Sequence, residues 1–495
     1  MNVQRWLFSI ERKASVIPHP MALFIYLLLI VLILSAVGQA FNWQAQHPSD
    51  LKVLAVNSLI SADGLRFILS SLVDNFMSFA PVGPVVIMAL AFSLAERSGL
   101  LRTLIMKLNQ GAGHASMSWA IAFLGVMSSI AVDSGYVVLL PLCAALFYAQ
   151  GRHPLAGLAL GFACVSGGFS ANLLVGPVDA MLSGISTEAV ALVANKEVSI
   201  LGNYYFMLVS VPLIVATAVL VNRWWVEPYL SANKGSLIRV GEQDDVSTHA
   251  GTLGRGFWVA LVLIMATWLA LTVPDGAVLR DPQTGSLKQG PFMASLVAMI
   301  ALSVALLASV FGIQQGMFRS WSTWVKALEQ GIKDIAPYLV LMFVVAQFIA
   351  WFKWSGLGPV LAVHLAKTLE AWQLNAALSM AFLMIFAAIL NLFIGSASAK
   401  WGLLAPILVP AFYILGIEPE VVQGAYRVAD SSTNIITPLM PYFPLVLAYG
   451  QKYQSDLSVG RLLTLMLPYA FTFLLIWGGL LTLWVAFGWP LGPSQ

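Results

Sequence analysis

The chain has 495 residues, of which 59% are hydrophobic and only 9% are charged. An average soluble domain carries roughly 25% charged residues, so the composition excludes an ordinary water-soluble protein. The net charge of +3 comes from basic residues scattered through polar segments, which argues against a nucleic-acid partner. Apolar runs of about 20 residues recur from end to end and predict a single all-α, polytopic membrane domain over residues 1–495.

These apolar runs predict nine transmembrane helices. In chain order we expect them near residues 21–40, 80–97, 155–180, 204–222, 256–273, 291–310, 336–352, 420–450 and 462–487. The first run has no clear small-x-small cleavage site after it, which indicates a retained span and not a signal peptide. Two further apolar stretches, 115–150 and 374–415, are split by polar residues and are predicted to be re-entrant hairpins.

The order and charge of these segments predict an inverted repeat. Most of the basic residues fall in segments that are cytoplasmic if the N-terminus lies inside, as the positive-inside rule requires. Five predicted spans separate the hairpins, so the first hairpin enters from the cytoplasm and the second from outside. We therefore expect a first repeat over 80–222, a cytoplasmic linker over 223–255 and a second repeat over 291–487.

Two polar, helix-breaking runs occur at matching places in these repeats. One is Ser170-Ala171-Asn172-Leu173-Leu174-Val175-Gly176-Pro177, and the other is Ser432-Thr433-Asn434-Ile435-Ile436-Thr437-Pro438. Backbone groups freed by such breaks cannot face lipid and must line water, ligand or protein. Paired interruptions near the bilayer midplane are typical of the binding site of a secondary transporter. A purely structural kink in each span is the alternative.

Five ionisable residues are predicted at membrane depth, where each needs a partner or a wet cavity. Arg427 and Asp430 share a helix face, which favours a local ion pair, although an arginine fork also suits a substrate carboxylate. Asp179 has no opposite charge near it in sequence, so we expect it to carry a proton or to help hold Na⁺. Asp133 and Lys400 occupy roughly matching positions in the two hairpins, where a structural bridge and a coupling role are both open.

Catalytic signals are absent from the sequence, which contains no P-loop, HExxH helix or GxSxG elbow. We therefore expect a transporter driven by an ion gradient, and neither an enzyme nor an ATPase. An intramembrane enzyme with Asp133 and Asp179 as a carboxylate pair is a remote alternative. Trp401, beside the second hairpin's break, is expected either to stack on an aromatic ring or to wedge the hairpin tip.

Four motifs together resemble the p-aminobenzoyl-glutamate transporter (AbgT) family of bacterial inner membranes, and the resemblance covers essentially the whole chain. The motifs are Pro18-His19-Pro20, Gly151-Arg152-His153-Pro154, Leu182-Ser183-Gly184-Ile185-Ser186-Thr187-Glu188 and Arg427-Val428-Ala429-Asp430-Ser431-Ser432. The resemblance implies a homodimer whose subunits have nine spans and two hairpins around a water-filled basin. It also implies a multi-pass inner-membrane location with a cytoplasmic N-terminus.

The same resemblance implies a set of functional residues. The family's aspartate after the first break matches Asp179, its hairpin residues match Ser398 and Trp401, and its later site residues match Pro419, Arg427 and Asp430. The architecture shared with dicarboxylate transporters suggests Na⁺ near the hairpin tips, with Asn172 and Asn434 as its natural ligands. Lys400 receives no role from the family, and no cofactor other than this Na⁺ is expected.

The leading hypothesis is a proton-motive-force-driven exporter of p-aminobenzoate-type folate precursors and sulfonamides. In it Asp179 is the proton-linked carboxylate, Arg427 is the anion anchor supported by Asp430, and Trp401 is the aromatic platform. The nearest rival is an Na⁺- or H⁺-coupled importer of p-aminobenzoyl-glutamate or a related dicarboxylate. The sequence does not set the direction of transport, because a two-sided site runs either way under different gradients.

Overall fold

The computed structural model describes residues 20–46, 53–80, 82–100, 103–104, 114–128, 135–232, 252–285, 287, 291–437, 440 and 442–493. These residues are mostly helical, with one short antiparallel pair of strands, β1 (Gln44–Gln46) and β2 (Val53–Ala55). Eight helical segments are long and apolar enough to cross a membrane, or nine if the bent pair α15–α16 forms one span. The predicted all-α, polytopic fold is confirmed.

The N-terminal part contains three helices before the first hairpin. They are α2 (Pro20–Ala40), α3 (Ala62–Met77) and α4 (Val82–Arg97). Two of them match predicted spans, but α3 was not predicted, because Asp63, Arg66 and Asp74 interrupt its apolar pattern. Only four residues, 78–81, separate α3 from α4, and residues 62–97 together form one segment of membrane-spanning length.

The first hairpin and the helices after it form a unit around an interrupted span. Its elements are α6 (His114–Met127), the π-helical turn η2 (Gly135–Leu139), α7 (Leu140–Ala149), α8 (Pro154–Phe162), the π-helical turn η3 (Ala163–Gly167), α9 (Pro177–Val190) and α10 (Tyr204–Val221). A Cβ built on Gly135 would lie 2.4 Å from Ser128 Oγ, so the two arms of the predicted hairpin meet near its tip. Asp133 lies outside the described residues.

The span predicted at 155–180 is wrong in its extent. It continues to Val190 and is broken between Gly167 and Pro177, so that η3 and α9 are separate helical pieces. Proline at the first position of α9 fits a new helix start, because its missing N–H would have no intrahelical partner there. The break itself falls where the sequence predicted it.

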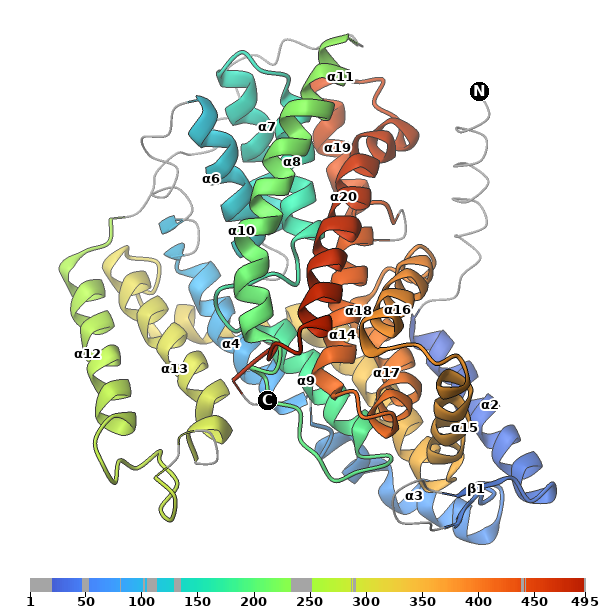
Figure 1. Cartoon of the computed structure of the whole chain (residues 1–495). Helices are drawn as coiled ribbons and strands as arrows, with labels where there is room; N and C mark the ends of the chain where they lie inside the picture. The colour runs from blue at the N-terminus through green and yellow to red at the C-terminus, as the bar shows by residue number, and fades with distance from the viewer. Residues whose placement is uncertain are drawn as a thin grey trace.

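A second stretch contains η4 (Asn222–Val226), α11 (Glu227–Ala232), α12 (Arg255–Thr272), α13 (Pro291–Gln314) and α14 (Trp321–Trp354). The predicted span 336–352 is therefore only the C-terminal half of a 34-residue helix. Helix α13 packs on α4 and on α12, and α4 packs on α14. Helices α12 and α13 stand at one side of the molecule (Figure 1), and the apolar window of α12 is only 6% buried, as expected of a lipid-facing helix.

The C-terminal part repeats the element order of the first unit. It comprises α15 (Leu357–Ala371), α16 (Ala376–Asn391), α17 (Ala397–Ile414), α18 (Pro419–Asn434), α19 (Phe443–Tyr453) and α20 (Val459–Ala486). The hairpin predicted at 374–415 corresponds to α16 and α17, and α16 follows α15 after a bend of 116°. Helix α15 was not predicted, because His364, Lys367 and Glu370 lower its hydrophobicity. The predicted span 420–450 is interrupted after α18.

The two units contact each other reciprocally. The second arm of the second hairpin, α17, packs on α9, which follows the first break, while α7 of the first hairpin packs on α19, which follows the second break. Helices α10 and α20, the continuous spans that end the two units, pack on each other (Figure 1). Such reciprocal contacts are expected of an internal two-fold repeat. The opposite membrane orientation of the two units stays a prediction.

Candidate functional site

The first break holds a carboxylate at the start of a helix. Asp179 lies in the first turn of α9, where its Oδ2 accepts hydrogen bonds from the Gly176 N–H at 2.8 Å and from Asn172 Nδ2 at 2.6 Å. A negative charge is favourable at a helix N-terminus, because the unpaired N–H groups there carry partial positive charge. Two predicted site residues, Asp179 and Asn172, are thus brought together by the local fold of the break.

Arg427 of α18 completes the coordination of this carboxylate. Its Nη2 lies 2.7 Å from Asp179 Oδ1 and donates to the Ser170 carbonyl at 3.0 Å. Both side chains are buried, with 1% and 5% of their surface exposed. The predicted local pair of Arg427 with Asp430 is therefore wrong. Asp179 has no opposite charge near it in sequence, and the fold supplies one because α18 packs against the first break.

A second buried ion pair joins Lys400 of α17 to Asp430 of α18. The Lys400 ammonium also donates to Asn391 Oδ1, at the end of α16. Both charged side chains are almost completely buried. For Lys400 the sequence left a structural bridge to Asp133 and a coupling role open, and the structure gives it Asp430 as a partner, whereas Asn391 was not predicted. The signal for Asn391 was its position as the first polar residue after an apolar run of α16.

The amide of Asn391 connects the second ion pair to the second break. Its Nδ2 faces three acceptors, the Asp430 carbonyl at 2.6 Å, Thr433 Oγ1 at 2.7 Å and Asn434 Oδ1 at 3.1 Å. Asn434 and Asn172 thus belong to different ion-pair clusters. Within the described ranges no group of three or more His, Cys, Asp and Glu side chains could hold a metal. Na⁺ bound by both asparagines stays a prediction.

The two clusters are linked where the first break contacts α18. The Ser170 N–H donates to Ser431 Oγ at 3.2 Å, so the backbone of the first break bonds directly to α18. Two cations and two carboxylates are buried together, which leaves the group neutral overall. Neutrality is required because an unpaired buried charge costs about 3–5 kcal/mol.

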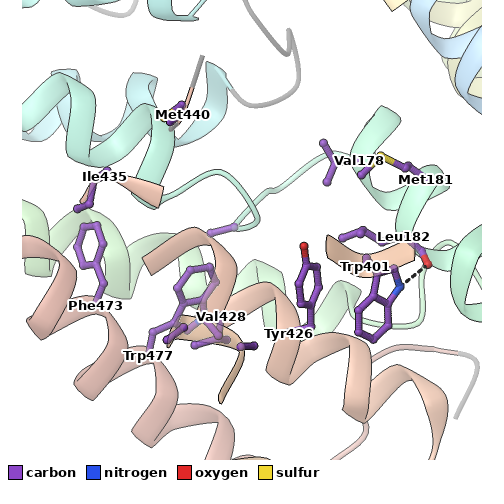
Figure 2. Packing of buried hydrophobic residues seen from close by; sticks show 14 of the residues in the cluster. Val178, Met181, Leu182, Trp401, Tyr426, Val428, Ile435, Met440, Phe473 and Trp477 are labelled. Carbon is purple, nitrogen blue, oxygen red and sulfur yellow. Dashed lines mark hydrogen bonds between the residues drawn. The ribbon is translucent and has the colours of Figure 1, made fainter. Parts of the chain in front are cut away.

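Trp401 is packed beside these charges. Its ring is fully buried and stacks on Tyr426, with 4.6 Å between centroids and 22° between planes. Its Nε1 donates to the Leu182 carbonyl at 3.2 Å, as Figure 2 shows. It also donates to Ser186 Oγ at 3.0 Å. Ser186 in turn donates to Gln423 Oε1 at 2.6 Å. The predicted aromatic stacking occurs within the protein, and the Trp401 ring is fixed in orientation from α9.

Two predicted site residues, Ser398 and Pro419, lie outside the two ion-pair clusters. Ser398 is half-buried in the first turn of α17, with its Oγ 3.2 Å from Ser396 Oγ. Pro419 is buried at the first position of α18, eight residues before Arg427 and therefore about 12 Å away along the helix axis. Pro419 thus begins the helix that carries the charges, and it does not belong to their cluster.

Arg427 and Ser432 of α18 each bury a polar atom outside the ion pairs that makes no hydrogen bond with the described residues. Arg427 Nε and Ser432 Oγ have no hydrogen-bond partner among the described residues. Leaving a buried donor unpaired costs about 1–3 kcal/mol, so such atoms are normally satisfied by water or a ligand. The guanidinium of Arg427 therefore has one edge committed to the protein and one N–H without a protein acceptor.

Comparisons with known proteins show which family shares this architecture. The profile of the AbgT transporter family matches residues 5–495. The p-aminobenzoyl-glutamate transport protein of Escherichia coli (strain K12) is 35% identical over 487 residues, which cover 98% of this chain and 95% of that protein. The chain belongs to the AbgT family. Its predicted membership is thereby confirmed.

Two solved AbgT-family structures are closely similar. The YdaH transporter of Alcanivorax borkumensis, described as having an unusual topology, superposes with a TM-score of 0.91 at 43% identity over 96% of this chain and 100% of that one. MtrF of Neisseria gonorrhoeae superposes with a TM-score of 0.91 at 38% identity over 99% of both chains. MtrF is described as illuminating a class of antimetabolite efflux pumps.

Besides the motif over residues 427–432, two of the motifs that indicated the AbgT family have visible structural roles. Leu182 to Glu188 lies in α9 and supplies the acceptors for the Trp401 indole. Arg152, in the turn between α7 and α8, pairs with Glu227 and donates to Ser118 Oγ at 3.0 Å. The first motif therefore supports the site, and the second ties the first hairpin to α11.

Proposed function

We propose that this AbgT-family protein exports p-aminobenzoate-type folate precursors and sulfonamides by proton-coupled secondary transport. The observation that carries the proposal is the buried Asp179–Arg427 ion pair, at the place where two interrupted helices meet. A carboxylate that can take a proton lies against a guanidinium that can bind an anion. The description of MtrF as an antimetabolite efflux pump supports the export direction.

Proton binding and substrate binding would be linked through Arg427. A proton on Asp179 Oδ1 removes the negative charge that holds Arg427 Nη2 at 2.7 Å. The guanidinium can then offer Nη2 together with Nε, which has no protein acceptor among the described residues, to a substrate carboxylate or sulfonamide. Such a fork binds a planar anion through two parallel hydrogen bonds. Bound together in this way, the proton and the anion would cross in the same direction, as in the rival importer. Export driven by the proton motive force would instead need the proton and the anion to occupy the Asp179–Arg427 pair in turn.

The aromatic part of the substrate would bind next to Trp401. In the present conformation this ring is covered by Tyr426. A stacking role therefore requires α17 and α18 to separate enough for a substrate ring to replace Tyr426. The separation would accompany alternating access, in which one packed unit moves against another.

Cellular accumulation of a sulfonamide tests this proposal. Cells making the wild type should accumulate less drug than cells making equal amounts of Asp179→Asn, whose accumulation should equal that of cells without the protein. Asp281→Asn is the matched control, since Asp281 is half-buried in the α12–α13 loop, away from the ion pairs, and its Oδ1 accepts hydrogen bonds from Thr284 and Gln283 of that loop. Equal accumulation in wild-type and Asp179→Asn cells would refute the assignment.

Import of p-aminobenzoyl-glutamate, coupled to H⁺ or Na⁺, is the second candidate. It is favoured by the 35% identical E. coli relative, named as a transport protein for that compound. Uptake into proteoliposomes under an imposed pH or Na⁺ gradient separates the two. Inward transport of p-aminobenzoyl-glutamate without sulfonamide movement would favour import.

For its setting we propose the bacterial inner membrane, with several spans, a cytoplasmic N-terminus and a homodimeric assembly. The full-length likeness to AbgT transporters supports a multi-pass membrane location. Cross-linking in native membranes and accessibility labelling of an N-terminal tag would test the dimer and the orientation.

A further inference from the structure

The Lys400 ammonium is held by oxygen atoms inside the membrane domain. Its Nζ contacts Asp430 Oδ1 and Asn391 Oδ1, and the side chain is 1% exposed. Lys400 lies in the first turn of α17, immediately after the polar interruption that follows α16. The charge is therefore placed at the tip of the second hairpin, beside α18.

The oxygens around this ammonium have the chemistry of a ligand set for a small hard cation. A carboxylate oxygen and an amide oxygen are among the ligands that such cations prefer in proteins. The orientation of Asn391 is fixed, because the acceptors of Asp430, Thr433 and Asn434 surround its Nδ2. Its Oδ1 must then point towards Lys400. The oxygens of Asp430 and Asn391 therefore already face one point where a positive charge can bind, and no side chain has to rotate to place them there.

We propose that the Lys400 ammonium is a covalently tethered substitute for a bound Na⁺ at the second break. The chain would carry its own cation against Asp430, and transport would need no Na⁺ at this place. A free Na⁺ would also be repelled by the ammonium at such short range. The inference deepens the proposed transport function, but its binding part does not depend on that function.

Thermal unfolding of the purified protein in NaCl or choline chloride of equal ionic strength tests the binding part. The wild type should unfold at the same temperature in both salts. Lys400→Ala leaves the Asp430 carboxylate buried without a counter-ion, so its unfolding temperature should rise with Na⁺ concentration, because Na⁺ binds the folded state only. Lys400→Arg keeps the charge and should remain insensitive to Na⁺.

A double variant and a milder substitution make the test decisive. Lys400→Ala combined with Asp430→Asn removes the carboxylate as well, and should lose the Na⁺ response. If Lys400→Ala does not fold in either salt, Lys400→Gln replaces it in the same comparison. Stabilisation of the wild type by Na⁺ would overturn the proposal without any variant. A folded Lys400→Ala protein that is indifferent to Na⁺ would overturn it equally.

Transport measurements then separate this inference from the proposed function. In proteoliposomes the Lys400→Ala variant should transport at least about tenfold more slowly without Na⁺ than with it, since an uncompensated buried charge disfavours the assembled site. The wild type should transport at the same rate with and without Na⁺. Absence of transport by the wild type would count against the proposed function only, because the unfolding comparison reads cation binding directly.

Discussion

Removing Asp179 and Arg427 together should destabilise the protein by less than the sum of the two single removals. Each single alanine variant leaves the partner's charge buried, with 1% or 5% of its side chain exposed, at a cost of about 3–5 kcal/mol. Asp179→Ala also strips an acceptor from Asn172 and from Gly176, at about 1 kcal/mol each. The double variant leaves no unpaired charge, so the two substitutions should be coupled by about 2–3 kcal/mol.

The same cycle built on Arg427 and Asp430 is the matched comparison. These residues are three apart on α18, but Asp430 pairs with Lys400, so their coupling should stay below about 1 kcal/mol. The free energy of unfolding is measured for all variants by titration with SDS in mixed micelles, followed by circular dichroism. Additivity of Asp179→Ala and Arg427→Ala within about 0.5 kcal/mol, or a larger coupling of Arg427 with Asp430, would refute the ion-pair assignment.

Three further predictions concern single side chains, two of them beside the site and one at the start of α8. Ser186→Ala removes the acceptor at 3.0 Å from Trp401 Nε1 and should cost about 1–2 kcal/mol of unfolding free energy, whereas Ser183→Ala, whose hydroxyl bonds only within α9, should cost less. Gly167→Ala puts a Cβ 2.7 Å from the Phe473 ring and should cost about 1–3 kcal/mol, while Gly479→Ala, with open space around it, should be neutral or stabilising. Burial and then the charge of Arg461 lower the pKa of His153, whose Nδ1 accepts from the Leu155 N–H at the start of α8. As the pH falls, the unfolded chain protonates this imidazole at a higher pH than the folded protein does. The contribution of neutral His153 to the free energy of unfolding should therefore be fully present above pH 6.5 and be lost as the pH falls through the lowered pKa. His153→Asn keeps a capping side chain and should flatten this pH dependence, and an unchanged profile would contradict the assignment.

Much of the fold could be predicted because the length and hydrophobicity of a segment are local properties. Helix α2 and helix α10 coincide with predicted spans, and both helix breaks fall at the predicted polar runs. Helices α3 and α15 were missed because their charged residues lower the mean hydropathy that marks a span. The family assignment also followed from short motifs, because these are recognised from the residues themselves without knowledge of the surrounding structure.

The sequence by itself determined which ionisable residues lie in the membrane domain and that two interruptions form a pair. Only the tertiary structure decided how the charges are matched, with Arg427 on Asp179 and Lys400 on Asp430. The spacing on α18 allowed a local pair, and the competing contacts come from α9 and α17, far away along the chain. Such a choice depends on which segments pack together, because a buried charge takes the partner that satisfies it at short range with the most hydrogen bonds.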